Sequence, residues 1–393
     1  MLSALVSLVT LIASAGPTRS GTDTATVVTT LGRDTIAVEQ YVLADGHLVG
    51  DVLLRAPHTV RYHYAMSFRP DGALARSMVD FSQPGMEGAP RVRTTITVAG
   101  DSARVEIDSA GVPRTFERPV AEQLLPEVMT GFGSDYGLYI SLGTYEAVAA
   151  TLGPALNVVH DVPVIDAATG GLRVKHLVRR SPTDLDVDYF RIAWTHLSLD
   201  AQGRIEGADA SGTTEKTRSV RTGPMNLDSA VAAFERLDRD GQSLGELSPP
   251  AFTTGRLGSA TISIHYNSPR KRGRAILGAT VPFGHVWRTG ADAATELVTD
   301  RAITIGGKEL AAGTYTLWTI PEADGATLIV NGQHGQWGTD YDPARDVLRV
   351  PMQVKRGQPI VQDFTIAVDD AGAHGELRMA WDDFVWTVAL SAK

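Results

Sequence analysis

The segment Trp287-Arg288-Thr289-Gly290-Ala291-Asp292 carries the side chains best suited to holding a small polar molecule. An indole offers a flat apolar face, and a guanidinium offers a planar fork of hydrogen-bond donors. Stacking combined with convergent hydrogen bonds suits sugars and other small polar ligands. The alternative is a buried Arg288–Asp292 ion pair that holds an irregular loop. The ligand-binding candidates of this region are Trp287, Arg288, Thr289, Asp292 and Thr295, with Trp337 as a further wall of the same pocket.

A second candidate is the basic run Arg270-Lys271-Arg272-Gly273-Arg274. Four cations around a glycine can hold a carboxylate, sulfate or phosphate, and arginine supplies two parallel donors to such a group. The other interpretation is a solvated loop. In that case Arg270, Arg272 and Arg274 pair with some of the 45 acidic residues of the chain.

No dense metal-binding or catalytic motif accompanies these residues. His265, His285 and His334 lie in the same half of the chain but far apart, and the sequence has no H-E-x-x-H motif. In Gly133-Ser134-Asp135-Tyr136-Gly137 the serine is not central, as it would be in G-x-S-x-G, and the sequence lacks a phosphate-binding loop and a dinucleotide fingerprint. We therefore predict no metal and no cofactor. An enzyme remains an alternative in which Asp292 and His265 or His285 form an acid–base pair from separate strands.

The elements that position these candidates are short β-strands. Beyond about Thr253 the sequence alternates apolar and polar residues between Gly, Pro and Asp turn signals. This spacing, with little helix, predicts a β-sandwich or jelly-roll-like domain. The expected strands are Thr261–Tyr266, Ala302–Ile305, Gly313–Ile320, Ala326–Asn331, Val347–Val354, Gln362–Val368, Gly375–Trp381 and Phe384–Leu390.

The N-terminal half predicts a curved antiparallel sheet. In Val60–Phe68, apolar residues alternate with polar ones, which is typical of a strand with one wet face. Further strands are expected at Thr94–Val98, Arg104–Ile107, Leu172–Arg179 and Leu185–Leu199.

Three short helices are expected in the same half. Apolar residues at three- and four-residue spacing predict helices over Pro119–Met129 and Tyr139–Leu152 that cover one face of the sheet. A third is expected over Asn226–Leu237, capped by Asp228. The Gly and Pro residues that follow it predict a domain boundary.

The predicted organisation therefore has four parts. These are a signal peptide over residues 1–20, an N-terminal antiparallel β domain with short helices over 21–237, a linker over 238–250, and a β-sandwich over 251–393. The chain of 393 residues is long enough for about two cores. The fold class is mainly β.

Export is predicted from the first residues. An apolar run from Leu2 to Ile12 precedes Ala13-Ser14-Ala15, which has the form of a cleavage site, although no Lys or Arg precedes the run. The chain contains no cysteine, and thus neither disulfides nor a lipid-anchoring cysteine. We expect a periplasmic or extracellular protein with no membrane span after the leader. The formal net charge of -9 argues against a nucleic-acid partner.

Residues from about 245 to 393 resemble a known family. The similarity is carried in order by Tyr266-Asn267-Ser268-Pro269, Val281-Pro282-Phe283-Gly284, Trp287-Arg288-Thr289-Gly290-Ala291-Asp292, Ala312-Gly313-Thr314-Tyr315 and Gln336-Trp337-Gly338. In this order and spacing they resemble the domain of unknown function 2911 (DUF2911) family of secreted bacterial proteins, which has Asn or Asp where Asp292 stands. The resemblance implies an extracytoplasmic β-sandwich and implies no reaction.

These observations favour an exported binding module for a small polar or anionic ligand held near Arg270, Trp287, Arg288 and Asp292. One alternative is a hydrolase or lyase with an acid–base site. Another is an envelope interaction protein without a small-molecule site. The sequence leaves the ligand and the oligomeric state open.

Overall fold

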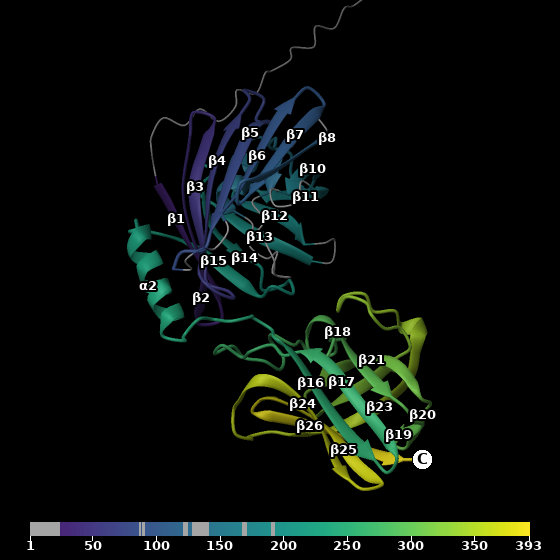
Figure 1. Cartoon of the computed structure of the whole chain (residues 1–393). Helices are drawn as coiled ribbons and strands as arrows, with labels where there is room; N and C mark the ends of the chain where they lie inside the picture. Colours follow the sequence, from purple (N-terminus) through teal and green to yellow (C-terminus); the bar gives the residue numbers. More distant parts are fainter. Residues whose placement is uncertain are drawn as a thin grey trace, which may run out of the picture. The chain divides into compact units, whose positions relative to one another are not determined.

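The computed structural model describes residues 24–85, 88, 91–120, 125–127, 141–166, 171–189 and 193–393. The predicted signal peptide lies outside the described residues. The chain divides into two compact units (Figure 1). The first comprises residues 1–31 and 35–243, and the second comprises residues 244–393 with the short segment 32–34.

The first unit is built on one large sheet of fifteen described strands, in the order β8-β7-β6-β5-β4-β3-β2-β1-β15-β14-β13-β12-β11-β10-β9. Neighbouring strands are antiparallel except β9 and β10, which are parallel. The strands are β1 (Thr24–Leu31), β2 (Asp34–Ala44), β3 (His47–Leu54), β4 (Val60–Phe68), β5 (Leu74–Ser82), β6 (Val92–Ala99), β7 (Ser102–Ser109), β8 (Val112–Pro119), β9 (Leu125–Glu127), β10 (Val159–Asp166), β11 (Leu172–Ser181), β12 (Asp184–Tyr189), β13 (Ala193–Leu199), β14 (Ile205–Asp209) and β15 (Thr217–Thr222).

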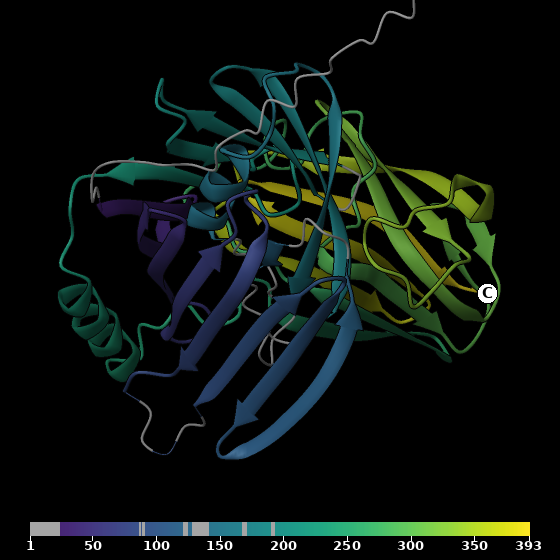
Figure 2. The ribbon, with the colours of Figure 1, turned by 90° about the horizontal axis from the view of Figure 1, so that it is seen from above.

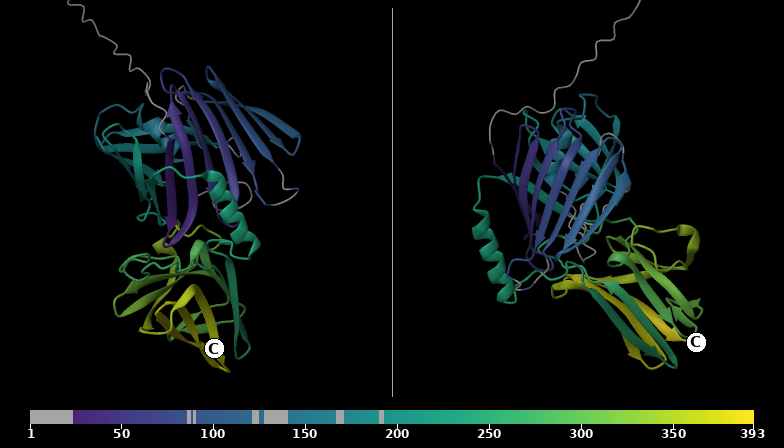
Figure 3. Two further views of the ribbon diagram at one scale, coloured as in Figure 1. Left: turned by 90° about the vertical axis from the view of Figure 1, so that its left-hand side faces the viewer. Right: turned by 45° about the horizontal axis from the view of Figure 1, so that its top comes forward.

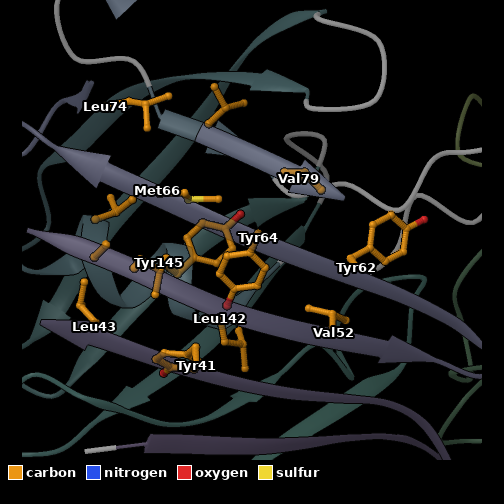
Figure 4. Packing of buried hydrophobic residues seen from close by; sticks show 14 of the residues in the cluster. Tyr41, Leu43, Val52, Tyr62, Tyr64, Met66, Leu74, Val79, Leu142 and Tyr145 are labelled. Carbon is orange, nitrogen blue, oxygen red and sulfur yellow. The ribbon is translucent and has the colours of Figure 1, made fainter. Parts of the chain in front are cut away.

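The sheet is strongly curved. Strands β3–β8, at one end of the strand order, face strands β10–β14 at the other end, as two views show (Figures 1 and 2). The alternation in β4 explains how one face becomes the core. Val60, Tyr62, Tyr64 and Met66 are buried, and Figure 4 shows Tyr62, Tyr64 and Met66 in the core. The residues between them are only partly buried. The buried residues of both halves of the sheet belong to one continuous hydrophobic cluster.

Helix α1 (Leu142–Ala149) lies within this curve, and all eight of its residues are buried. Its N-terminus meets a buried carboxylate, because Glu39 accepts hydrogen bonds from the Leu142 amide at 2.8 Å and the Tyr64 hydroxyl at 2.6 Å. Near its other end Glu146 accepts from the Tyr41 hydroxyl at 2.7 Å and from the Ile205 amide at 2.8 Å. The helix is thus bonded to β2 and β14, and the Glu39 carboxylate that it contacts is also bonded to β4.

Helix α2 (Leu227–Arg239) packs on the opposite, outer face of the sheet (Figure 3). Its apolar side contacts Val38 and Leu53, and the Arg55 guanidinium lies 4.8 Å from the centre of the Phe234 ring. The N-cap is Asn226, whose side chain accepts from the Ser229 amide at 2.8 Å. The predicted cap at Asp228 is wrong, because Asp228 lies inside the first turn.

The second unit is a nearly closed sheet in the order β16-β17-β18-β21-β22-β23-β26-β19-β20, with β25 on β26 and β24 on β25. Strand β24 returns beside β16, where a β-carbon on Gly255 would lie 2.3 Å from Val368 Cγ1. The elements are β16 (Pro250–Leu257), β17 (Ala260–Asn267), β18 (Ala291–Thr299), β19 (Ile303–Ile305), β20 (Lys308–Leu310), β21 (Gly313–Glu322), β22 (Gly325–Asn331), the 3-10 helix η1 (Pro343–Arg345), β23 (Asp346–Lys355), β24 (Val361–Ala371), β25 (His374–Asp382) and β26 (Phe384–Ala392).

The fold class is mainly β, as predicted, and all eight strands expected in the second unit are present. Besides the cap at Asp228, two expectations in the first unit are wrong. Leu185–Leu199 forms two antiparallel strands, β12 and β13, rather than one. The described part of Pro119–Met129 contains the strand β9 instead of a helix. Among the described helices, none has the length and apolar character needed to cross a bilayer.

Candidate functional site

The segment predicted to bind a ligand forms a sharply bent loop between two strands of the second unit. Trp287 pairs with Thr319 of β21, with backbone N···O distances of 2.7 and 2.9 Å. The chain then turns through Thr289 and Asp292, whose φ angles are +56° and +55°, and enters β18. Positive φ is unfavourable for a β-branched residue such as threonine, so the surrounding contacts must stabilise this conformation.

Buried hydroxyl groups provide that stabilisation. Thr289 and Thr295 are fully buried. The Thr295 hydroxyl donates to the Thr289 carbonyl at 2.8 Å, and the Thr289 hydroxyl lies 3.2 Å from that of Thr319. The Trp287 indole N–H donates to the Gly290 carbonyl at 3.0 Å. Two of the predicted ligand-binding residues, Thr289 and Thr295, therefore use their hydroxyl groups to hold the loop.

Three of the predicted residues converge on one glycine. The Gly338 amide donates to the Asp292 carbonyl at 2.9 Å. The Arg288 side chain passes directly over Gly338, where a β-carbon would lie 2.0 Å from Arg288 Cδ. Trp337, the preceding residue, forms a backbone bridge with Ala293 and has 45% of its surface exposed. Arg288, Asp292 and Trp337 are thus adjacent although Trp337 is distant in sequence.

Gln336 joins this group, and sequence reasoning did not single it out as a binding residue. The Thr316 hydroxyl donates to the Gln333 carbonyl at 2.9 Å, so it can offer only an acceptor to Gln336. The side-chain amide of Gln336 accordingly donates to Thr316 at 3.1 Å. This assignment leaves Gln336 Oε1 buried with no hydrogen-bond donor among the described residues. Its position next to Trp337 was the one signal available in the sequence.

Trp287 packs in the core rather than beside Trp337. Its ring stacks on Trp381 at a centroid distance of 6.0 Å and an interplanar angle of 15°. Phe364 meets it edge-on at 5.0 Å. Because neighbouring aromatic rings cover the indole, its contribution is to anchor the start of the loop.

The guanidinium groups of the basic run have partners within the protein. Arg270 pairs with Asp363 at 2.6 Å, and Arg274 Nη2 donates to the Arg270 carbonyl at 2.5 Å. Arg272, 2% exposed at its side chain, donates to Asp34 at 2.6 Å. Burial lowers the pKa of Arg274 to about 10, with Arg272 acting in the same direction and Asp34 opposing it. Arg270 and Arg272 thus pair with acidic residues, whereas Arg274 donates to backbone carbonyls.

The histidines occupy exposed positions in the second unit. His265 stands opposite Glu296 in the β17–β18 register and stacks against Phe252, which is 72% exposed, at 6.2 Å. His285 and His334 lie in exposed loops. Within the described ranges, no group of three or more His, Asp or Glu side chains could hold a metal ion.

Comparison with known proteins shows what the second unit is similar to. Residues 248–390 match the family model described as protein of unknown function (DUF2911), so the resemblance predicted from the residues is confirmed. Among solved structures, the chain is similar to a DUF1089 family protein from Pseudomonas aeruginosa, with 12% identity and a TM-score of 0.31. That match covers 44% of this chain and 89% of the other. No curated protein matches the sequence.

Proposed function

We propose that the C-terminal DUF2911 domain binds a small polar anion that also carries hydroxyl groups, such as a sugar acid or a sugar phosphate. The observation that carries this proposal is the convergence of Arg288, Asp292 and Trp337 at Gly338. A glycine there lets the aliphatic part of the Arg288 side chain lie against the backbone beside an exposed indole.

Each group has a distinct part in binding. Arg288 supplies parallel donors to a carboxylate or phosphate, and Trp337 offers an apolar face to a sugar ring. The Oε1 atom of Gln336 needs a donor, and a ligand hydroxyl is a suitable one. The loop is already held by buried hydroxyl bonds, so little conformational entropy is lost when a ligand binds.

We also place this activity outside the cytoplasm. The apolar run before Ala13-Ser14-Ala15 supports export.

Thermal-shift titration of the full chain tests the proposal. We expect D-glucuronate and D-glucose 6-phosphate to raise the unfolding midpoint, with D-glucose having a smaller effect. Arg288→Lys keeps the charge but loses the planar fork, and Trp337→Ala removes the stacking face, so both should abolish the shift. Arg378→Lys is the matched control, because Arg378 forms an exposed ion pair with Asp369 in the same domain.

Two results would overturn the proposal. One is the absence of a shift with every one of these anions. The other is an equal shift in Arg288→Lys, Trp337→Ala and the unmodified chain.

A further inference from the structure

The N-terminal sheet contains a groove of its own on the outer face of β3–β7. Its volume is about 480 Å³, within the usual range of roughly 300–1,000 Å³ for small-molecule sites. The acidic and basic side chains that line it are those of Asp51, Arg61, His63, Asp80, Arg91, Arg93 and Asp108.

Charges of opposite sign alternate across the strands in this groove. Asp51 stands opposite His63, His63 opposite Asp80, Asp80 opposite Arg93, and Arg93 opposite Asp108. These side chains share the face opposite the hydrophobic core, because their neighbours along each strand are buried.

Two of the three carboxylates are satisfied by cations of the groove itself. Asp51 Oδ1 accepts from Arg61 Nε at 2.8 Å and lies 3.2 Å from His63 Nδ1. Asp80 receives two bonds from Arg93, at 2.6 and 2.8 Å. These pairs neutralise Arg61 and Arg93 and leave them little capacity for a ligand.

Of the charged residues in the groove, Arg91 and Asp108 remain, one positive and one negative. Arg91 is exposed, and its guanidinium has no ion pair or hydrogen bond within the described part of the chain. Asp108 is exposed as well, and one of its oxygens accepts from the Gly111 amide at 2.7 Å. Its other oxygen has no donor in the described residues.

The register places these two groups close enough to share one ligand. Arg93 is directly opposite Asp108, and Arg91, two residues before Arg93, lines the same groove. Diagonal neighbours of this kind are about 7–8 Å apart at their α-carbons. A molecule with an anionic and a cationic group a few bonds apart can therefore contact both.

We propose that this groove binds a small zwitterion of the α-amino acid type. The ligand carboxylate pairs with Arg91 through parallel N–H donors, and the ligand ammonium pairs with the open oxygen of Asp108. The site is independent of the one at Gly338, because it uses other residues in the other unit and takes a ligand of no net charge.

Isothermal titration of the full chain with L-serine tests this inference, with acetate and methylamine as half-ligands. We expect L-serine to bind at least about tenfold more tightly than either half-ligand, because each half-ligand forms one of the two ion pairs. Arg91→Gln and Asp108→Asn should each weaken L-serine binding by about tenfold or more. Asp108→Asn retains the acceptor for the Gly111 amide, so the turn is preserved.

Arg114→Gln is the control, because Arg114 is an exposed arginine on the adjacent strand β8 that does not line the groove. The affinity of the Arg114→Gln variant for L-serine should match that of the unmodified chain. The inference fails if L-serine does not bind, if acetate binds equally well, or if Arg91→Gln binds L-serine normally while its unfolding midpoint is unchanged.

Discussion

Arg288 and Gly338 are in such close contact that no side chain fits at position 338. A β-carbon there would lie 2.0 Å from Arg288 Cδ and 2.4 Å from the carbonyl oxygen of Asp292. The arginine side chain could move aside, but the carbonyl belongs to the backbone of a loop that is bonded on both sides. Glycine at 338 is therefore a requirement of the loop itself as well as of the proposed site.

The first prediction is that Gly338→Ala destabilises the domain and disturbs the site. Relieving the clash needs a backbone shift, which we expect to lower the free energy of unfolding by about 1–3 kcal/mol. Denaturant unfolding measures this change. Gly332→Ala is the control, because a β-carbon there would be 3.4 Å from Val347 Cγ2, an ordinary contact. An equal effect of the two substitutions would contradict the prediction.

The second prediction concerns the hydroxyl groups that hold the loop. Thr295→Val keeps the shape but removes the donor to the Thr289 carbonyl, which leaves a buried acceptor without a partner. We expect a loss of about 1–3 kcal/mol in the free energy of unfolding. Thr314→Val, a half-buried position on β21, should change it by less than about 0.5 kcal/mol. A neutral Thr295→Val would show that the loop does not depend on this bond.

The strands could be predicted where side-chain alternation and turn residues agree. Val60–Phe68 alternates without interruption and is β4 residue for residue. By contrast, the boundary between β12 and β13 was missed because the sequence between Tyr189 and Ala193 contains no Gly, Pro, Asn or Asp to signal a turn. Strand β18 was also missed, because it begins within the irregular Trp287–Asp292 segment.

The residues of the proposed site could be selected from the sequence, but the contacts that bring them together could not be predicted. Arg288 and Asp292 lie in one short segment, so local sequence was enough to select them. Their contact with Gly338 and the orientation of Gln336 depend on a loop from another part of the chain. In the same way, Asp363 pairs with Arg270 across 93 positions in sequence, which no local pattern could indicate.

The third prediction concerns the buried carboxylate of Glu39. It is fully buried and accepts from the Leu142 amide and the Tyr64 and Ser141 hydroxyls. Glu39→Gln places an NH₂ group against these donors and removes the negative charge at the start of α1. We expect the free energy of unfolding to fall by about 2–4 kcal/mol.

Glu106→Gln is the control for this substitution. Glu106 forms a solvent-exposed ion pair with Arg104, and such pairs contribute at most about 1 kcal/mol. Circular dichroism at increasing urea concentration compares the two variants. If Glu39→Gln and Glu106→Gln unfold at the same midpoint, the bonds between β2 and α1 contribute little to stability.

The fourth prediction is a pH dependence that arises from Glu215. Burial raises the pKa of its carboxyl from 4.5 to about 8, and the positive charge of Lys175 opposes this shift only in part. Between these two values the folded protein keeps a proton that the unfolded chain releases. Stability from this group is therefore fully present below pH 4.5 and is lost as the pH rises to about 8.

The variant Glu215→Gln cannot ionise and avoids this loss. The difference in free energy of unfolding between Glu215→Gln and the unmodified chain should therefore shift in favour of the variant from about pH 5 to about pH 9. Urea titrations at the two pH values measure this difference. Glu106→Gln, at an exposed position, should differ from the unmodified chain by the same amount at both pH values. A Glu215→Gln difference that is also constant with pH would mean that Glu215 ionises at its ordinary pKa in the folded protein.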